Sequence, residues 1–171
     1  DMDQINIPDY DFINLDAYIE GNLRTNTTIR ENAPVWVTRG CPYRCAFCSA
    51  PHLNGKPIRT HSVDYMVKWV KYLYYEKGIR WINIIDDNFT YHVKYAEEFC
   101  NRIIELDLKD LKFGTPNGIR MGRGNLKLWK LMKRAGWDIL IVAPETGSQK
   151  VADFMEKDID LQTVPQIVED I

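Results

Sequence analysis

The chain has 171 residues, of which 45% are hydrophobic and 27% are charged. This length is typical of one domain with a buried core, and the composition is that of a soluble globular protein. No apolar stretch approaches the roughly 20 residues needed to cross a bilayer, so we expect no membrane span and a cytoplasmic location. The net charge of −2 gives no support for broad nucleic-acid binding.

Residues 1–32 are polar and are predicted to form a lead-in segment with one short helix around Leu15, Tyr18 and Ile19. The tripeptide Asn26-Thr27-Thr28 is interpreted as a chance match to a glycosylation sequon, because nothing indicates a secretory route. The chain begins at Asp1 rather than Met, which indicates a piece of a longer or processed protein.

Residues 33–171 alternate short apolar runs with amphipathic helices and are predicted to form the core domain. Strands are expected at 35–38, 79–85 and 137–143, and a third strand in chain order is expected to begin at 111–113 and end at 115–118. Helices are expected around 63–74, 96–106, 128–135 and 151–155, and a fifth helix is expected to start within 162–171. Four βα units in a row imply parallel strands and right-handed crossovers, hence an α/β sheet of the TIM-barrel type with helices outside.

Three of the four cysteines stand close together in Cys41-Pro42-Tyr43-Arg44-Cys45-Ala46-Phe47-Cys48, directly after the first apolar run. Three ligands are one too few for a closed tetrahedral metal site. Thiolates select zinc, copper(I) or iron–sulfur clusters, and a [4Fe–4S] cluster held by three cysteines keeps one iron open for chemistry.

Two other interpretations of these cysteines remain open. His52 follows Cys48 closely enough for a Cys3His zinc site. Disulfides are less favoured, because nothing points to an oxidising compartment. The fourth cysteine, Cys100, shares an apolar stripe with Phe99 and Ile103 and is predicted to pack in the core.

Polar residues follow the other predicted strands at the point where each strand ends. Asp86, Asp87 and Asn88 follow the second strand, Asn117 the third, and Glu145 to Ser148 the fourth. The carboxyl ends of parallel strands meet at one rim, so we expect these residues to lie near the three cysteines. Asp86 could instead only cap the turn that leaves its strand. Arg120 and Arg123 could bind a carboxylate or phosphate, but solvated charge is the favoured interpretation.

The cysteine spacing, with Phe47 as its aromatic residue, resembles that of the radical S-adenosylmethionine (SAM) enzymes. The resemblance extends over about residues 8–171 to the branch that is usually fused to cobalamin-binding domains. It is carried by Thr38-Arg39-Gly40-Cys41-Pro42, Asp86-Asp87-Asn88-Phe89, Thr115-Pro116-Asn117-Gly118-Ile119-Arg120 and Glu145-Thr146-Gly147-Ser148.

This resemblance implies an enzyme in which Cys41, Cys45 and Cys48 hold a [4Fe–4S] cluster. It further implies that SAM is bound by residues at the strand exits: Asp86 and Asp87 at the methionine amine, Phe47 at the adenine, Glu145 with Ser148 at the ribose, and Asn117 in the same pocket. The reaction would produce a 5′-deoxyadenosyl radical. The implied partners are a small-molecule substrate of unknown identity and an electron donor such as a ferredoxin or flavodoxin.

The chain also departs from the family pattern. A radical SAM core normally has six βα units, so a core of about four units is expected to be incomplete, with a further domain or chain completing the barrel. Cobalamin would need a domain that this chain does not contain. The alternative function is a non-catalytic iron–sulfur or zinc-binding module.

Overall fold

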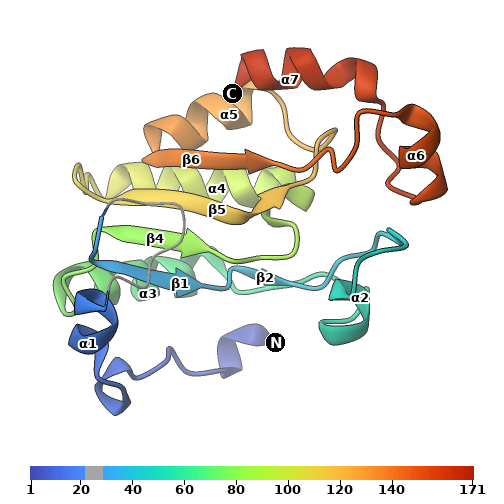
Figure 1. Ribbon diagram of the computed structural model, residues 1–171. Helices are drawn as coiled ribbons and strands as arrows, with labels where there is room; N and C mark the ends of the chain where they lie inside the picture. The colour runs from blue at the N-terminus through green and yellow to red at the C-terminus, as the bar shows by residue number, and fades with distance from the viewer. Residues whose placement is uncertain (22–28) are drawn as a thin grey trace.

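The sheet consists of four parallel strands in the order β1-β4-β5-β6 (Figure 1). The computed structural model describes residues 1–21 and 29–171, so the sequon at residues 26–28 lies outside the described residues. The strands of the sheet are β1 (Asn32–Val35), β4 (Trp81–Ile84), β5 (Lys112–Ile119) and β6 (Trp137–Val142). All four strands point the same way, as right-handed βα repeats require.

Three amphipathic helices cover one face of the sheet (Figure 1). They are α3 (Val63–Tyr75), α4 (Val93–Glu105) and α5 (Leu126–Arg134). The side chains of Ser62 and Asn125 cap the N-termini of α3 and α5, which explains where these helices begin. Each helix buries the apolar stripe that its sequence predicts, and Cys100 is fully buried with Phe99 in that core.

Stacked aromatic rings link the core to the strands. The ring of Trp137 stacks on that of Phe113, with 4.7 Å between centroids, and on that of Phe89, with 5.5 Å between centroids. Phe89 belongs to the short helix η3 (Phe89–Tyr91), which directly follows the acidic exit of β4. The hydrophobic core therefore anchors the loop that leaves β4 through the buried side chain of Phe89.

The lead-in segment packs along the helical layer. It contains η1 (Met2–Gln4), η2 (Tyr10–Phe12) and the predicted short helix, α1 (Leu15–Glu20). The Asp3 carboxylate accepts a hydrogen bond from the Ser62 amide at 2.9 Å and lies 3.2 Å from His61 Nδ1. The segment is thus attached at the N-terminus of α3.

The first apolar run is not one strand, which corrects the prediction of a strand at 35–38. The strand β1 ends at Val35, and β2 (Thr38–Arg39) pairs antiparallel with β3 (Arg59–Thr60) in a separate two-stranded sheet. The carboxylate of Asp86 accepts hydrogen bonds from the amides of Val37 and Thr38 at 2.7 and 2.8 Å. Those amides are therefore engaged by a side chain, and the chain leaves the parallel sheet.

The segment between β2 and β3 projects beyond the carboxyl ends of the strands (Figure 1). It contains residues 41–48, here called the cysteine loop, and the short helix α2 (Ala50–Leu53), which the sequence pattern did not indicate. The third strand also differs from its prediction, because β5 continues through residues 115–118 to Ile119 with an irregular register against β6.

The last part of the chain forms a small unit of its own beside the end of β6. It consists of α6 (Gln149–Phe154), η4 (Leu161–Thr163) and α7 (Val164–Asp170). A second, smaller hydrophobic cluster holds it, with Met121, Ala152 and Ile159 buried at its centre.

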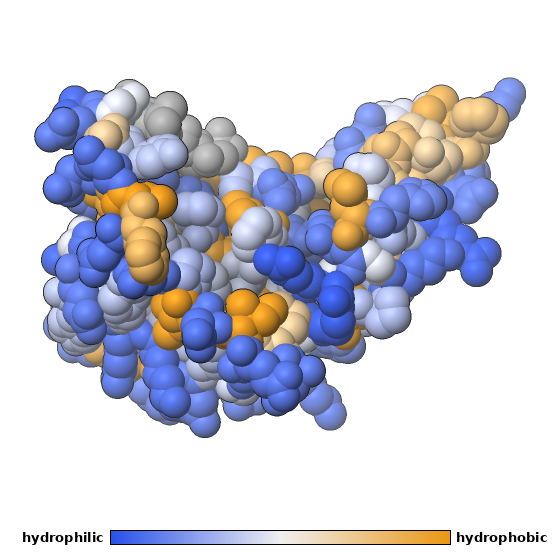
Figure 2. All heavy atoms as spheres, turned by 90° about the horizontal axis from the view of Figure 1, so that it is seen from below, coloured by the Kyte–Doolittle hydropathy of each residue, from blue (hydrophilic) through white to orange (hydrophobic). Residues whose placement is uncertain are grey.

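The fold prediction is confirmed as an α/β fold with a parallel, open sheet and helices on its outer face. In the described ranges no helix covers the opposite face, and the sheet does not close into a barrel (Figure 1). Seen from below, the molecule has a wide notch between two projecting parts (Figure 2). Over these same ranges, no helix has the length and apolar character that a bilayer span requires.

Candidate functional site

A cavity of about 130 Å³ lies where β4, β5 and β6 end and the cysteine loop begins. The residues that line it come from five separate chain segments. They are Cys41, Tyr43, Cys45, Phe47, Cys48, Asp87, Asn88, Asn117, Gly118, Ile119, Arg120, Ala143, Glu145 and Lys157. All three clustered cysteines, and most of the polar residues expected at the strand exits, therefore share one site.

The three thiols of the cysteine loop are free and half-buried. Burial raises the pKa of the Cys41 thiol above its ordinary value. The Cys41 amide donates to Gly55 O at 3.1 Å, and the Cys48 amide donates to Cys45 O at 3.0 Å, so backbone bonds shape the loop.

These thiols surround the cavity and do not converge on one point. Within residues 1–21 and 29–171, no three or more His, Cys, Asp or Glu side chains are grouped so that they could hold one metal ion. His52 is exposed on α2 and is not among the residues that line the cavity. The described geometry therefore offers the three thiols without the fourth ligand of a Cys3His site.

Asp87 faces the cavity and ties the cysteine loop to the exit of β4. Its carboxylate accepts hydrogen bonds from the Gly40 amide at 3.1 Å and from Asn54 Nδ2 at 2.9 Å. One carboxylate thus fixes both the residue that precedes Cys41 and the end of α2.

Asp86 is not among the residues that line the cavity, unlike its neighbour Asp87. Its side chain is buried beneath the junction of β1 and β2, where it accepts the two backbone hydrogen bonds described above. Burial raises the pKa of Asp86 to about 7. A carboxyl group enclosed in this way stabilises the loop through these backbone hydrogen bonds.

Two asparagines add amide groups to the cavity wall. Asn117 donates from Nδ2 to Ile85 O at 2.8 Å, which joins the ends of β5 and β4. Asn88 is buried, and within residues 1–21 and 29–171 neither its Nδ2 nor its Oδ1 atom has a hydrogen-bond partner. Buried amide groups are normally satisfied, so Asn88 provides an unused donor and an unused acceptor at the cavity.

Glu145 forms an ion pair with Lys157, whose Nζ lies 3.0 Å from Glu145 Oε1. The Lys157 side chain is only 8% exposed, and its Nζ lies 5.4 Å from the centre of the Phe47 ring. Glu145 has a φ of 66°, a strained value for this residue type. Ser148, by contrast, is exposed and does not line the cavity.

Sequence reasoning missed two cationic residues of this site. Lys157 follows α6 in a charged stretch that gives no periodic or motif signal, and only the folded chain brings it back to Glu145. Arg120 was expected to be solvated, yet it is buried at the cavity wall with its guanidinium against the Tyr43 ring. In the sequence, the position of Arg120 directly after the end of a strand is only a weak indication that its charge is buried.

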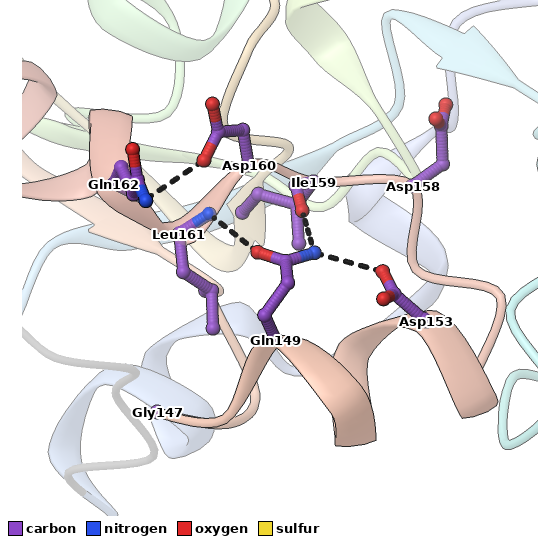
Figure 3. Close-up of a pocket in the computed structure, with 8 residues that line it drawn as sticks. All are labelled: Gly147, Gln149, Asp153, Asp158, Ile159, Asp160, Leu161 and Gln162. Atoms are coloured by element: carbon purple, nitrogen blue, oxygen red, sulfur yellow. Dashed lines mark hydrogen bonds between the residues drawn. The ribbon is translucent and has the colours of Figure 1, made fainter.

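A larger hollow, of about 700 Å³, lies elsewhere, beside α6 and η4 (Figure 3). The groups that line it bond to one another: Gln149 Nε2 donates to Asp153 Oδ1 and to Ile159 O, and Gln149 Oε1 accepts from the Leu161 amide. No thiol lines it. The smaller cavity at the cysteine loop is therefore the one lined by groups that can bind a cofactor.

Comparison with known proteins shows the family to which the chain is similar. The family model described as the radical SAM superfamily matches residues 35–171. A relative from Pyrococcus horikoshii, named as an uncharacterized methyltransferase, is 32% identical over 161 residues, which make up 94% of this chain and 33% of the relative. The chain thus spans about a third of the length of that relative.

Two solved structures share the fold. One is TsrM, a radical S-adenosylmethionine methyltransferase from Kitasatospora setae with its tryptophan substrate and a SAM analog bound; it has a TM-score of 0.68 at 18% identity and covers 81% of this chain and 25% of TsrM. The other is OxsB, a cobalamin-dependent S-adenosylmethionine radical enzyme with aqua-cobalamin and SAM bound; it has a TM-score of 0.65 at 22% identity and covers 75% of this chain and 20% of OxsB.

Proposed function

Since this chain belongs to the radical SAM superfamily, we propose that Cys41, Cys45 and Cys48 hold a [4Fe–4S] cluster and that SAM binds beside it. When bound, the reduced cluster and SAM together supply a 5′-deoxyadenosyl radical. The chain's own residues position these groups and limit the access of water. The observation that carries the proposal is that three thiols from one loop line a cavity at the ends of three parallel strands.

The donor set of the cavity fits such a cluster. Thiolates are the ligands that iron–sulfur clusters prefer, and a cluster is wider than a single ion, which suits three thiols that surround a space. Three cysteine ligands also leave one iron without a protein ligand. The fourth cysteine, Cys100, is fully buried in the core and is not among the cavity residues.

The polar groups of the cavity fit the charged ends of SAM. Its amine carries a positive charge and is matched by the Asp87 carboxylate, and its carboxylate is matched by the Lys157 ammonium. Asn88 can both donate and accept, which suits a ligand that brings hydrogen-bonding groups of both kinds. Asn117, Phe47 and Glu145 remain proposed contacts for the rest of SAM.

Binding of SAM requires the cavity to widen. Its volume of about 130 Å³ is smaller than that of typical ligand pockets, which begin at about 300 Å³. Separation of Lys157 from Glu145 would open it, and Phe47, which is 53% exposed, is free to move with them. We propose that the SAM carboxylate replaces Glu145 as the partner of Lys157.

We further propose methyl transfer to a small molecule as the class of reaction. This rests on the names of the relatives, two of which are methyltransferases. The chain spans only part of those proteins, so cobalamin and the substrate contacts would come from segments outside it. A one-electron donor such as a ferredoxin or flavodoxin would reduce the cluster.

Anaerobic reconstitution tests the proposal. The full-length protein should bind four iron and four sulfide ions, and the Cys41→Ala, Cys45→Ala and Cys48→Ala variants should each lose the cluster. The matched control is Cys100→Ala, which removes a thiol outside the cavity and should retain the cluster. Stoichiometric zinc in place of iron would overturn the proposal in favour of a zinc module. A stable cluster without SAM binding would indicate a non-catalytic iron–sulfur module.

A further inference from the structure

Arg120 connects three segments of the site through one buried guanidinium group. Its side chain is 8% exposed. Its Nη1 lies within hydrogen-bond distance of sulfur, 3.6 Å from Cys45 Sγ. Its Nη2 donates to Lys157 O and, at 2.8 Å, to Asp158 O. The end of β5, the cysteine loop and the segment after α6 therefore meet at this residue.

The same guanidinium lies against an aromatic ring of the cysteine loop. Its carbon is 3.5 Å from the centre of the Tyr43 ring, which is the geometry of a cation–π contact. The Tyr43 hydroxyl accepts a hydrogen bond from Arg123 Nε at 2.8 Å. The guanidinium of Arg123 in turn lies 4.8 Å from the centre of the Tyr91 ring. We call Arg120, Tyr43, Arg123 and Tyr91 the arginine clamp.

Among the residues that the structure describes, the charge of Arg120 is only partly balanced by carboxylates. Arginine stays protonated in proteins, and a buried charge is costly unless it is paired. The Asp158 carboxylate lies 3.6 Å away, but its side chain is 85% exposed, so water screens much of this pair. Glu145 is paired with Lys157 instead. The guanidinium thus presents positive charge to the Cys45 sulfur.

We propose that Arg120 is a positioning residue that fixes Cys45 and raises the reduction potential of the iron–sulfur cluster. The proposal rests on the proposed function for the cluster itself. Reduction adds one electron, supplied by the external one-electron donor, and makes the cluster more negative. A fixed positive charge and a hydrogen bond at one sulfur stabilise this reduced state relative to the oxidised one.

Measurement of the cluster's midpoint potential tests the electrostatic part. The reconstituted full-length protein and its Arg120→Gln, Arg120→Lys and Arg123→Gln variants are titrated anaerobically and followed by electron paramagnetic resonance. We expect a clearly more negative potential in Arg120→Gln, an intermediate one in Arg120→Lys, and a potential close to that of the wild type in Arg123→Gln. Arg123 is the matched control, because it belongs to the clamp without touching a sulfur. An unchanged potential in Arg120→Gln overturns the tuning role.

Hydrogen exchange of the cluster-free protein tests the positioning part. We expect the amides of residues 41–48 to exchange several-fold faster in both Arg120 variants, because lysine keeps the charge but loses the planar contact with Tyr43. Exchange equal to that of the wild type would overturn the positioning role. A wild-type protein that assembles no cluster overturns the proposed function and the tuning together, whereas the exchange result still decides whether Arg120 positions the loop.

Discussion

Asp86 and Asp87 are neighbours in sequence, but they occupy very different surroundings. Asp87 is partly exposed and faces the cavity, whereas Asp86 is buried and bonded to the backbone of residues 37 and 38. Burial outweighs the hydrogen bonds that favour the charged form of Asp86 and raises its pKa from 3.8 to about 7. This difference has a measurable consequence for stability.

The raised pKa of Asp86 makes stability fall as pH rises. Between 3.8 and about 7 the folded chain holds a proton on this carboxyl that the unfolded chain has released. Folding is therefore favoured at the low end of this window, and the advantage disappears as pH passes the folded pKa. We expect the free energy of unfolding of the wild type, relative to Asp86→Asn, to be larger at pH 5 than at pH 8.

Urea denaturation at the two pH values measures this effect. The exposed Asp138 at the start of β6 provides the control, because Asp138→Asn removes a carboxyl of the same kind from the surface. A wild-type advantage that grows with pH would show that Asp86 is charged in the folded protein, which would contradict the argument.

Lys157 offers the second test at the scale of single residues. If its ammonium binds the SAM carboxylate, Lys157→Gln should weaken SAM binding by about tenfold, or about 1.4 kcal/mol, because a charge-assisted contact is lost. Equilibrium dialysis against the cluster-loaded protein measures this. Lys150→Gln, an exposed neighbour in α6, should bind SAM as the wild type does. Equal SAM affinities of the two variants would mean that Lys157 has only a structural role.

At the scale of elements, the two-stranded sheet formed by β2 and β3 depends on Gly40. This residue has a φ of 100°, and a Cβ atom there would lie 2.4 Å from Pro57 O and 3.0 Å from Gly55 O. Gly40 immediately precedes Cys41, so a shift of this sheet would displace the first thiol. We therefore expect Gly40→Ala to lower both the melting temperature and the iron content.

Gly78→Ala is the control that distinguishes the effect of backbone strain from that of a steric clash. Gly78 also has a positive φ, 67°, but no atom of the described part of the chain lies within 4 Å of the position that a Cβ atom would take. Gly78→Ala should cost only the conformational strain, about 1 kcal/mol, and keep the full iron content. Equal losses of melting temperature and iron content in the two variants would show that the close contacts at Gly40 do not determine the position of the first thiol.

Much of the element order was predictable, because the apolar runs and helical stripes are long and regular. Periodicity predicted the parallel sheet and helices around 63–74, 96–106 and 128–135, which the structure places at 63–75, 93–105 and 126–134. The two-stranded sheet of β2 and β3 was not predicted, since its strands have two residues each and depend on the distant carboxylate of Asp86. Its pairing is a tertiary effect.

The candidate site was predictable to the extent that residues next to strand ends define it. Asp87, Asn117 and Glu145 come together because parallel strands end at one rim, and the cysteine loop beyond β2 lies at the same rim. The sequence could not separate Asp86 from Asp87, which face opposite environments one residue apart. It also could not place Lys157, because that contact depends on how the chain returns after α6.

At the scale of the whole molecule, the two hydrophobic clusters differ greatly in size. The large one joins the sheet to α3, α4 and α5, and the small one holds α6 and α7 with three buried residues at its centre. Local opening is easiest where few apolar contacts must be broken. We expect amides in residues 149–170 to exchange with deuterium well before those of the three large helices.

SAM should slow this exchange. Glu145 and Lys157 belong to the same end of the molecule as the small cluster, so a ligand held by both would stabilise the segment between them. The measurement compares cluster-loaded protein with and without SAM. Uniform exchange across both clusters would mean that the protein opens as one unit.

The sheet order β1-β4-β5-β6 follows the order of the strands along the chain, with consequences for synthesis on the ribosome. Each βα unit can dock on the one made just before it, so no strand waits for a distant partner. The starting edge carries Pro34, which lacks an amide for a further neighbour and discourages pairing there. Strand addition is thereby directed toward the other edge, and a nascent chain grows its sheet in one direction.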